Sequence, residues 1–240
     1  MPSIQRLRVM GLAVLVLSGS AVDVAAQSGA LDEIVVTGSR RTGEAVVPLP
    51  AVTIRKRADF LVQAVSISND TRDAKSRKAE TYQTVRGLVQ AAARIPGMSL
   101  AFQKGVLIPI TDKDYQVPLT DDGDRNDASH ATIYVKLALT PQTDVTQAIT
   151  TLETFISDAK MVGRTSLDSE GDVALSVINP ERYRGEVIAA IAQSVKELRT
   201  ALGDRCRINV GDFSRRLQWQ RSEVSELTLY LPYDLRVEGC

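Results

Sequence analysis

The side chains that could support catalysis or metal binding are few and far apart. The chain has one histidine, His130, and two cysteines, Cys206 and Cys240. Ser129 is too close in sequence to be a nucleophile that His130 activates, and no Gly-x-Ser-x-Gly elbow occurs. A zinc site would need His130, both cysteines and a carboxylate, without the close spacing usual for zinc ligands.

Phosphate-binding and dinucleotide-binding glycine patterns are also absent from the sequence. We therefore expect no catalytic residues, no cofactor and no metal site, so that the protein is not an enzyme. An unrecognised hydrolase that depends on His130 is the alternative.

The acidic segment 111–129 includes part of a pattern that superficially resembles a calcium loop. Asp122, Asp124 and Asn126 fall on its first, third and fifth positions. Asp127 stands where the loop needs glycine, and Ile133 stands where it needs a bidentate glutamate. We expect a long, solvated surface loop, and ion binding by this loop is left open.

The two cysteines allow one disulfide in an oxidising compartment. Cys206 opens an apolar run and Cys240 is the last residue of the sequence, where chains are usually mobile. Two unpaired cysteines are the favoured interpretation, and a Cys206–Cys240 bridge is the alternative.

Residues 1–26 have the three parts of a secretory signal peptide. Arg6 and Arg8 precede the apolar run Val9–Leu17, and small residues at Val24–Ala26 suit cleavage before Gln27. An uncleaved anchor is the alternative. We expect a soluble periplasmic protein. The 240 residues carry 29 basic and 29 acidic side chains, and this zero net charge argues against a nucleic-acid partner.

Residues 27–50 are rich in glycine and proline, so we expect a flexible arm before a folded domain at 51–240. Within the arm, the segment 32–41 (DEIVVTGSRR) is similar to the TonB box of outer-membrane receptors. The resemblance implies strand addition to the sheet edge of a TonB-type periplasmic protein. The residues that would dock are Glu33, Ile34, Val35, Val36, Thr37 and Gly38. A β-prone linker and an edge strand of the same domain are the alternatives, and together they are favoured.

The remaining pattern predicts an α+β fold with the order β-α-β-β-α-β-α-β-β, in which about three helices pack on one face of a mostly antiparallel sheet. Helices are expected after Asn69 or Asp70, after Thr143 or Asp144, and after Asn179. The first strand is expected to bulge near Ala64. Strands are predicted at 58–68, 98–110 (interrupted at Gly105), 130–139, 164–167, 173–178, 206–210, 216–220 and 226–237.

Residues from about 52 to 237 resemble the SIMPL domain family of exported bacterial proteins. The resemblance rests on the strand-to-helix opening 58–80, the strand ATIYVKLAL at 131–139 and the helix 180–203, which ends in Leu-Gly. It implies a periplasmic α+β protein that can form homo-oligomers. We therefore expect a non-enzymatic protein in envelope maintenance or stress tolerance, with the apolar strand 226–237 pairing between subunits as far as Pro232 allows. A TonB-linked accessory binding module is the alternative.

Overall fold

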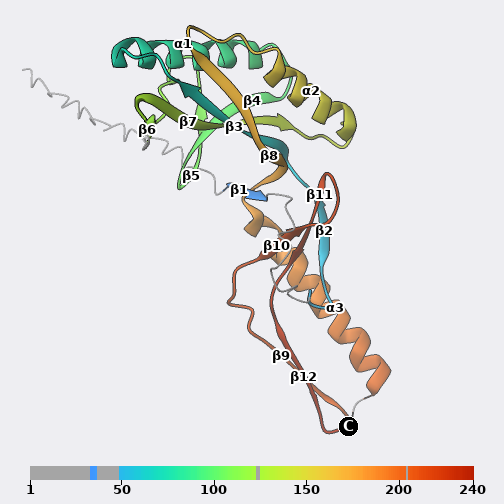
Figure 1. The fold of residues 1–240 in the computed structure, drawn as a ribbon. Coiled ribbons are helices and arrows are strands. Elements are labelled where there is room, and N and C mark those ends of the chain that lie inside the picture. The colour runs from blue at the N-terminus through green and yellow to red at the C-terminus, as the bar shows by residue number, and fades with distance from the viewer. Residues whose placement is uncertain (1–32, 37–48, 123–124, 204) are drawn as a thin grey trace, which may run out of the picture.

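The computed structural model describes residues 33–36, 49–122, 125–203 and 205–240. The molecule is elongated: a large sheet with two helices forms one end, and the C-terminal part of the chain extends away from it (Figure 1). The predicted signal peptide (1–26), Thr37 and Gly38 lie outside the described residues.

The large sheet is antiparallel, with strand order β1-β8-β3-β7-β4-β5 and β6 pairing with β7. Two units, β3-α1-β4 and β7-α2-β8, interleave so that each places a strand between the two strands of the other. This is the split β-α-β arrangement of ferredoxin-like folds, and it determines architecture but not function. The elements are β1 (Glu33–Val36), β3 (Phe60–Asn69), α1 (Ala74–Ala92), β4 (Met98–Lys104), β5 (Val106–Ile110), β6 (Thr120–Asp122), β7 (Arg125–Ala138), α2 (Val145–Ser157) and β8 (Thr165–Ile178).

Both helices of this layer begin after an aspartate. Asp144 accepts a hydrogen bond from the amide of Gln147 at 2.9 Å, which confirms one of the caps predicted for α2. For α1 the prediction was wrong, because the cap is Asp73, which accepts from the amide of Ser76 at 2.8 Å. Asn69 instead accepts from the amide of Thr71, two residues on, in the local turn typical of asparagine.

The main core lies between the large sheet and helices α1 and α2. Alternate residues of the central strands β3 and β7 point toward the helices, as a strand with one buried face requires. The largest buried contributors include Leu61, Ile67, Ile133, Leu152 and Leu175.

The large sheet also curls, because β1 and β5 lie close together although they stand at opposite ends of the strand order. Side chains on the face away from the helices are buried too, which indicates that the curl encloses this face. They include Val62, Ala101, Leu107 and Ala174, none of which belongs to the main core.

A second, three-stranded sheet with order β10-β11-β2 forms the waist of the molecule. Its strands are β2 (Ile54–Arg57), β10 (Gln218–Arg221) and β11 (Glu226–Tyr230). Helix α3 (Arg184–Leu202), which follows the short 3₁₀ turn Pro180–Tyr183, packs along β2. Val187 and Ile191 of α3 are buried in one continuous core with Leu227 and Leu229 of β11.

The far end of the molecule is narrow. Strands β9 (Arg207–Gly211) and β12 (Asp234–Glu238) form a two-stranded antiparallel ribbon. We call this ribbon and the second half of α3, residues 192–202, the stalk. It is visible in Figure 1 as the orange and red end of the chain.

The α+β class, the three helices and the bulge, which lies between Val62 and Ala64, are confirmed. Four details differ from the predictions. Helix α3 packs on the second sheet, whereas α1 and α2 share a face of the large one. Strand β7 already begins at Arg125, so residues 111–129 are only partly loop. Residues 165–178 form one strand, and 226–237 form two, β11 and β12.

Candidate functional site

The segment predicted to dock a partner contains a strand of the protein's own sheet. Residues Glu33–Val36 form β1, which pairs antiparallel with β8. Ile34 and Val36 pack against the main core, while Glu33 projects from the other face. The prediction that all of residues 27–50 lie outside the folded domain is therefore wrong for these four residues. For residues 33–36, the structure shows the interpretation of this segment as an edge strand of the same domain.

Glu33 fastens β1 to the middle of the sheet through a buried ion pair. The Lys136 ammonium of β7 lies 2.5 Å from one Glu33 carboxylate oxygen, and each side chain is only 9% exposed. The Ser176 hydroxyl of β8 donates a short hydrogen bond to the same carboxylate. Lys136 also lies over the Phe60 ring, 4.2 Å from its centroid. Because a buried charge is costly without a partner, this contact holds β1 in place.

The ladder geometry directs some backbone groups of β1 away from β8. Among the described residues β1 pairs with no second strand, although β5 comes near it. The Ser176 carbonyl accepts from the amide of Asp59, so the backbone of Ser176 is directed toward β3. Val35, which lies opposite Ser176, therefore directs its own backbone groups away from β8. Its neighbour Ile34, opposite Val177, is directed toward β8.

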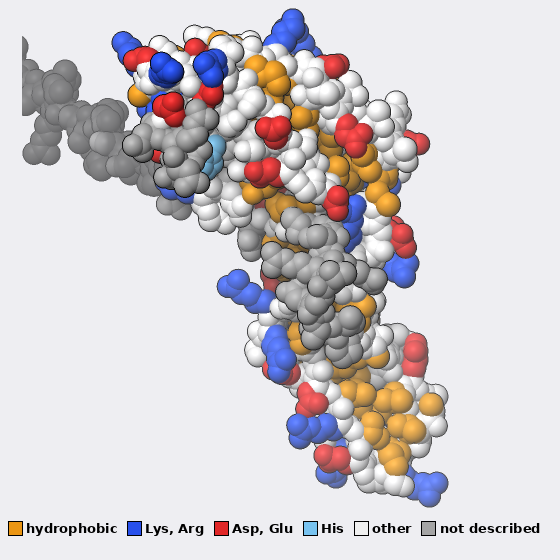
Figure 2. All heavy atoms as spheres, in the orientation of Figure 1, with side chains coloured by type: hydrophobic (Ala, Val, Ile, Leu, Met, Phe, Trp, Pro, Cys, Tyr) orange, Lys and Arg blue, Asp and Glu red, His pale blue; other side chains and the backbone are white. Residues whose placement is uncertain are grey.

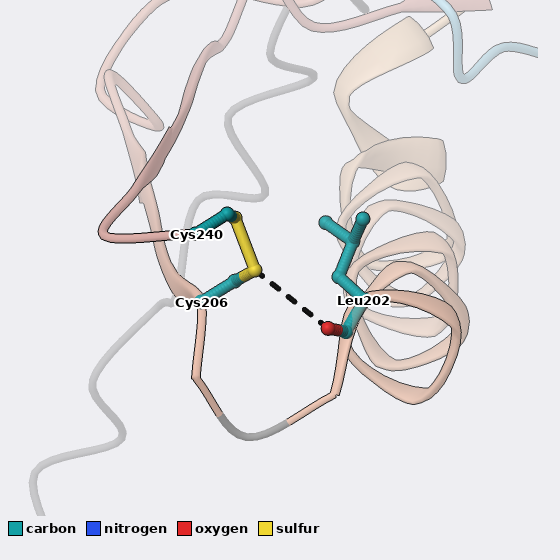
Figure 3. The surroundings of a disulfide bond; sticks show 3 residues. All are labelled: Leu202, Cys206 and Cys240. Atoms are coloured by element: carbon teal, nitrogen blue, oxygen red, sulfur yellow. Dashed lines mark hydrogen bonds between the residues drawn. A yellow bond between two sulfur atoms is a disulfide. The ribbon is translucent and has the colours of Figure 1, made fainter.

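The two cysteines meet at the tip of the stalk. Cys206 and Cys240 form a disulfide with Cα atoms 4.6 Å apart, so the favoured interpretation of two unpaired cysteines was wrong. Figure 3 shows the bond joining the chain end to the turn after α3. The Cys206 sulfur is 3.7 Å from the Leu202 carbonyl oxygen; since a disulfide sulfur has no hydrogen to donate, we regard this as a contact. The bridge closes the end of the ribbon at which β9 begins and β12 ends, next to the end of α3.

The stalk carries large apolar side chains that the described part of the chain leaves partly exposed. Leu202 of α3 and Leu235 and Val237 of β12 are 41%, 39% and 40% exposed. In the ribbon register Leu235 lies opposite Val210 and Val237 opposite Ile208, so one face of the ribbon is apolar. Ile208 and Val210 on that face are buried or half-buried within the molecule, and Leu235 and Val237 form its exposed part. Figure 2 shows hydrophobic side chains gathered on this end of the molecule.

His130, the residue on which a hydrolase would depend, lies exposed on β7 in a row of hydroxyl-bearing residues. It is directly opposite Ser68 of β3, whose hydroxyl is 2.7 Å from that of Ser166 on β8. No local sequence pattern places Ser68 and Ser166 beside His130, because the three residues come from three strands that are distant in the sequence. Within the described part of the chain the imidazole makes no hydrogen bond or ion pair, whereas a nucleophile needs a base within hydrogen-bond reach.

The calcium-like pattern does not have the geometry of a binding loop where the structure describes it. Asp122 ends β6, and Ile133 is fully buried in the middle of β7. Among the described residues, no group of three or more His, Cys, Asp or Glu side chains is placed to hold a metal ion.

A carboxylate ties the start of α1 to the turn before β8. Glu80 accepts hydrogen bonds from Asn69 Nδ2 at 3.0 Å, the Thr71 hydroxyl at 2.6 Å and the Arg164 amide at 3.2 Å. The hydrogen bond from Asn69 lowers the pKa of Glu80 most, and the hydrogen bonds from Thr71 and Arg164 lower it further. Gly163 passes so close that a Cβ there would lie 2.1 Å from the Glu80 carboxyl carbon, and its φ of +60° also favours glycine.

No protein-family model matches the chain, and no curated protein is significantly similar to it. None of the helices in the described ranges has the length and apolar character needed to cross a bilayer.

Proposed function

We propose that the chain is an exported, non-enzymatic, SIMPL-like protein of the cell envelope that assembles with further copies of itself through the stalk, in a role in envelope maintenance or stress tolerance. The observation that carries the proposal is the uncovered apolar surface of Leu202, Leu235 and Val237. Contiguous exposed apolar surface usually marks an interaction site.

A second copy of the chain suits this surface better than an unrelated partner. A two-stranded ribbon is at best marginally stable alone, and in the described residues β9 and β12 pair only with each other. Each strand therefore keeps one unpaired edge beside the apolar face. Two copies present the same edges and the same face, as a symmetric, self-complementary contact requires. Strand β11, at the start of the run 226–237 predicted to pair between subunits, already pairs with β10 on one side and β2 on the other. It therefore has no edge left to pair with a second copy.

Export is supported by the leader-like residues 1–26 and by the disulfide, since such bonds persist in oxidising compartments. A disulfide that fastens the stalk also suits a surface that must keep its shape to pair with a copy of itself.

The proposal is tested by sedimentation velocity on the mature protein, from Gln27 onward, over a wide concentration range. We expect a species heavier than the monomer, together with slower amide exchange in residues 207–211 and 234–238 at high concentration. A monomer at all concentrations, with unchanged exchange in the ribbon, would refute assembly.

A TonB-linked accessory module remains the second candidate, favoured by the backbone of Val35 on β1, which is directed away from β8. In this case a partner strand would add to the side of β1 that faces away from β8, and the ion pair between Glu33 and Lys136 would stay intact. The two candidates use different surfaces, so experiments can separate them.

A further inference from the structure

A cavity of about 670 Å³, open to solvent, lies between helices α1 and α2 and is lined only by residues of these helices and of the turns that follow them. Its size is within the usual range for small-molecule sites. Leu88 and Phe155, both buried, are among its walls, together with Ala91 and Ile95. The cavity is remote from β1 and from the stalk.

Two of the three threonines in the wall are less polar than their residue type suggests. The Thr150 hydroxyl donates to the Thr146 carbonyl at 3.2 Å, and the Thr151 hydroxyl donates to the Gln147 carbonyl at 2.8 Å. With their hydroxyls bonded back to their own helix, these residues contribute largely methyl surface. The exposed lining is mostly apolar as a result.

Gly87 leaves open space beside α1 in the wall of the cavity. It stands inside the helix, where glycine is less stable than alanine, yet a Cβ built there would meet no atom within 4 Å. No neighbouring group in the described structure therefore requires a glycine. A glycine in the wall of a cavity allows a ligand to approach the backbone closely.

The charges at the cavity indicate what kind of ligand it takes. Arg94 lines it just beyond the end of α1, and Lys160 lines it beyond the end of α2. Neither forms an ion pair with any described residue. The single carboxylate in the wall, Asp158, is two residues from Lys160. The end of the cavity at Arg94 is thus positively charged, and no acidic residue of the lining lies beside Arg94 in the sequence.

We propose that this cavity binds a single-chain anionic amphiphile, such as a free fatty acid, with its chain along Leu88, Gly87 and Phe155 and its carboxylate at Arg94. The inference is independent of assembly through the stalk, because it concerns the opposite end of the molecule.

The test is a titration of the mature protein with cis-parinaric acid, followed by displacement with oleate or oleyl alcohol. We expect saturable 1:1 binding. Gly87→Leu should fill the cavity and weaken binding by about ten- to a hundredfold, while raising Tm by roughly 1–4 °C because it removes a helix glycine. A lower affinity in a more stable protein cannot be caused by unfolding.

Gly185→Leu is the matched control, since Gly185 is also in a helix with no atom within 4 Å of a Cβ. It should leave binding unchanged. Arg94→Gln should weaken oleate but not oleyl alcohol. Equal loss with Gly87→Leu and Gly185→Leu, no binding by the unaltered protein, or binding only to phosphatidylglycerol vesicles would overturn the proposal.

Discussion

Glu33 and Lys136 stand 103 residues apart in the sequence and form an ion pair in which both side chains are 9% exposed. The pair spans the large sheet from its edge strand β1 across β8 and β3 to β7, and Ser176 on β8 bonds to the same carboxylate. A segment with the composition of a linker is thereby an integral strand of the fold.

Glu33→Gln should destabilise the protein strongly, because it leaves Lys136 buried without a counter-charge. Removing one partner of a buried pair costs about 3–5 kcal/mol, which urea unfolding at neutral pH would measure. The double variant Glu33→Gln, Lys136→Met removes both charges and should recover most of the loss. A single variant as stable as the unaltered protein would show that β1 contributes little to the fold.

Two proline substitutions in β1 separate folding from docking. Ile34→Pro removes an amide directed toward β8, and losing this ladder hydrogen bond should lower the free energy of unfolding by roughly 1–3 kcal/mol. Val35→Pro removes an amide directed away from β8 and should cost much less. If a TonB-type protein adds a strand to β1, Val35→Pro should abolish binding measured by calorimetry while the protein stays folded. Unchanged binding by this variant would eliminate the TonB-linked candidate.

The disulfide should stabilise chiefly the stalk. It joins residues 34 positions apart, for which the loss of chain entropy in the unfolded state corresponds to about 4 kcal/mol. In Cys240→Ser we expect faster amide exchange in β9 and β12, with little change in β3 and β7 of the large sheet. Uniformly faster exchange would mean instead that the stalk and the sheet unfold as one unit.

Glu80 gives the fold a defined dependence on pH. Its pKa is lowered in the folded protein by the hydrogen bond from Asn69 and then by those from Thr71 and Arg164. Its contribution to stability is therefore complete above the ordinary glutamate pKa and is lost as the pH falls through the lowered, folded-state value. Glu80→Gln should flatten the acid limb of stability against pH in urea titrations. Glu153→Gln, at an exposed position on α2, is the control and should leave that limb unchanged.

The local elements of this fold could be predicted from the sequence, and the long-range contacts could not. The Asp144 cap and the bulge in β3 depend on a few neighbouring residues, and both are confirmed. The pairing of β1 with β8 depends on Lys136 and Ser176, more than 100 residues away. No local pattern carries that information, so the composition of residues 27–50 indicated a linker.

The same reason explains the errors at the C-terminal end. The run 226–237 is mostly apolar and was predicted as one edge strand that pairs between subunits. In the structure β11 lies between β2 and β10, and β12 turns away to pair with β9. A terminal cysteine is usually mobile, but this ribbon brings Cys240 to Cys206. The row of His130, Ser68 and Ser166 was likewise hidden, because it exists only when β7, β3 and β8 are aligned.

Assembly through the stalk is tested most directly by comparing two substitutions of exposed apolar residues in sedimentation equilibrium. Leu235→Lys places a charge on the apolar face of the ribbon, whereas Val224→Lys places one at a 51% exposed position in the turn between β10 and β11. Self-assembly through the stalk predicts that the unaltered protein and Val224→Lys associate equally, and that Leu235→Lys sediments as a folded monomer. Equal masses for all three proteins would contradict it.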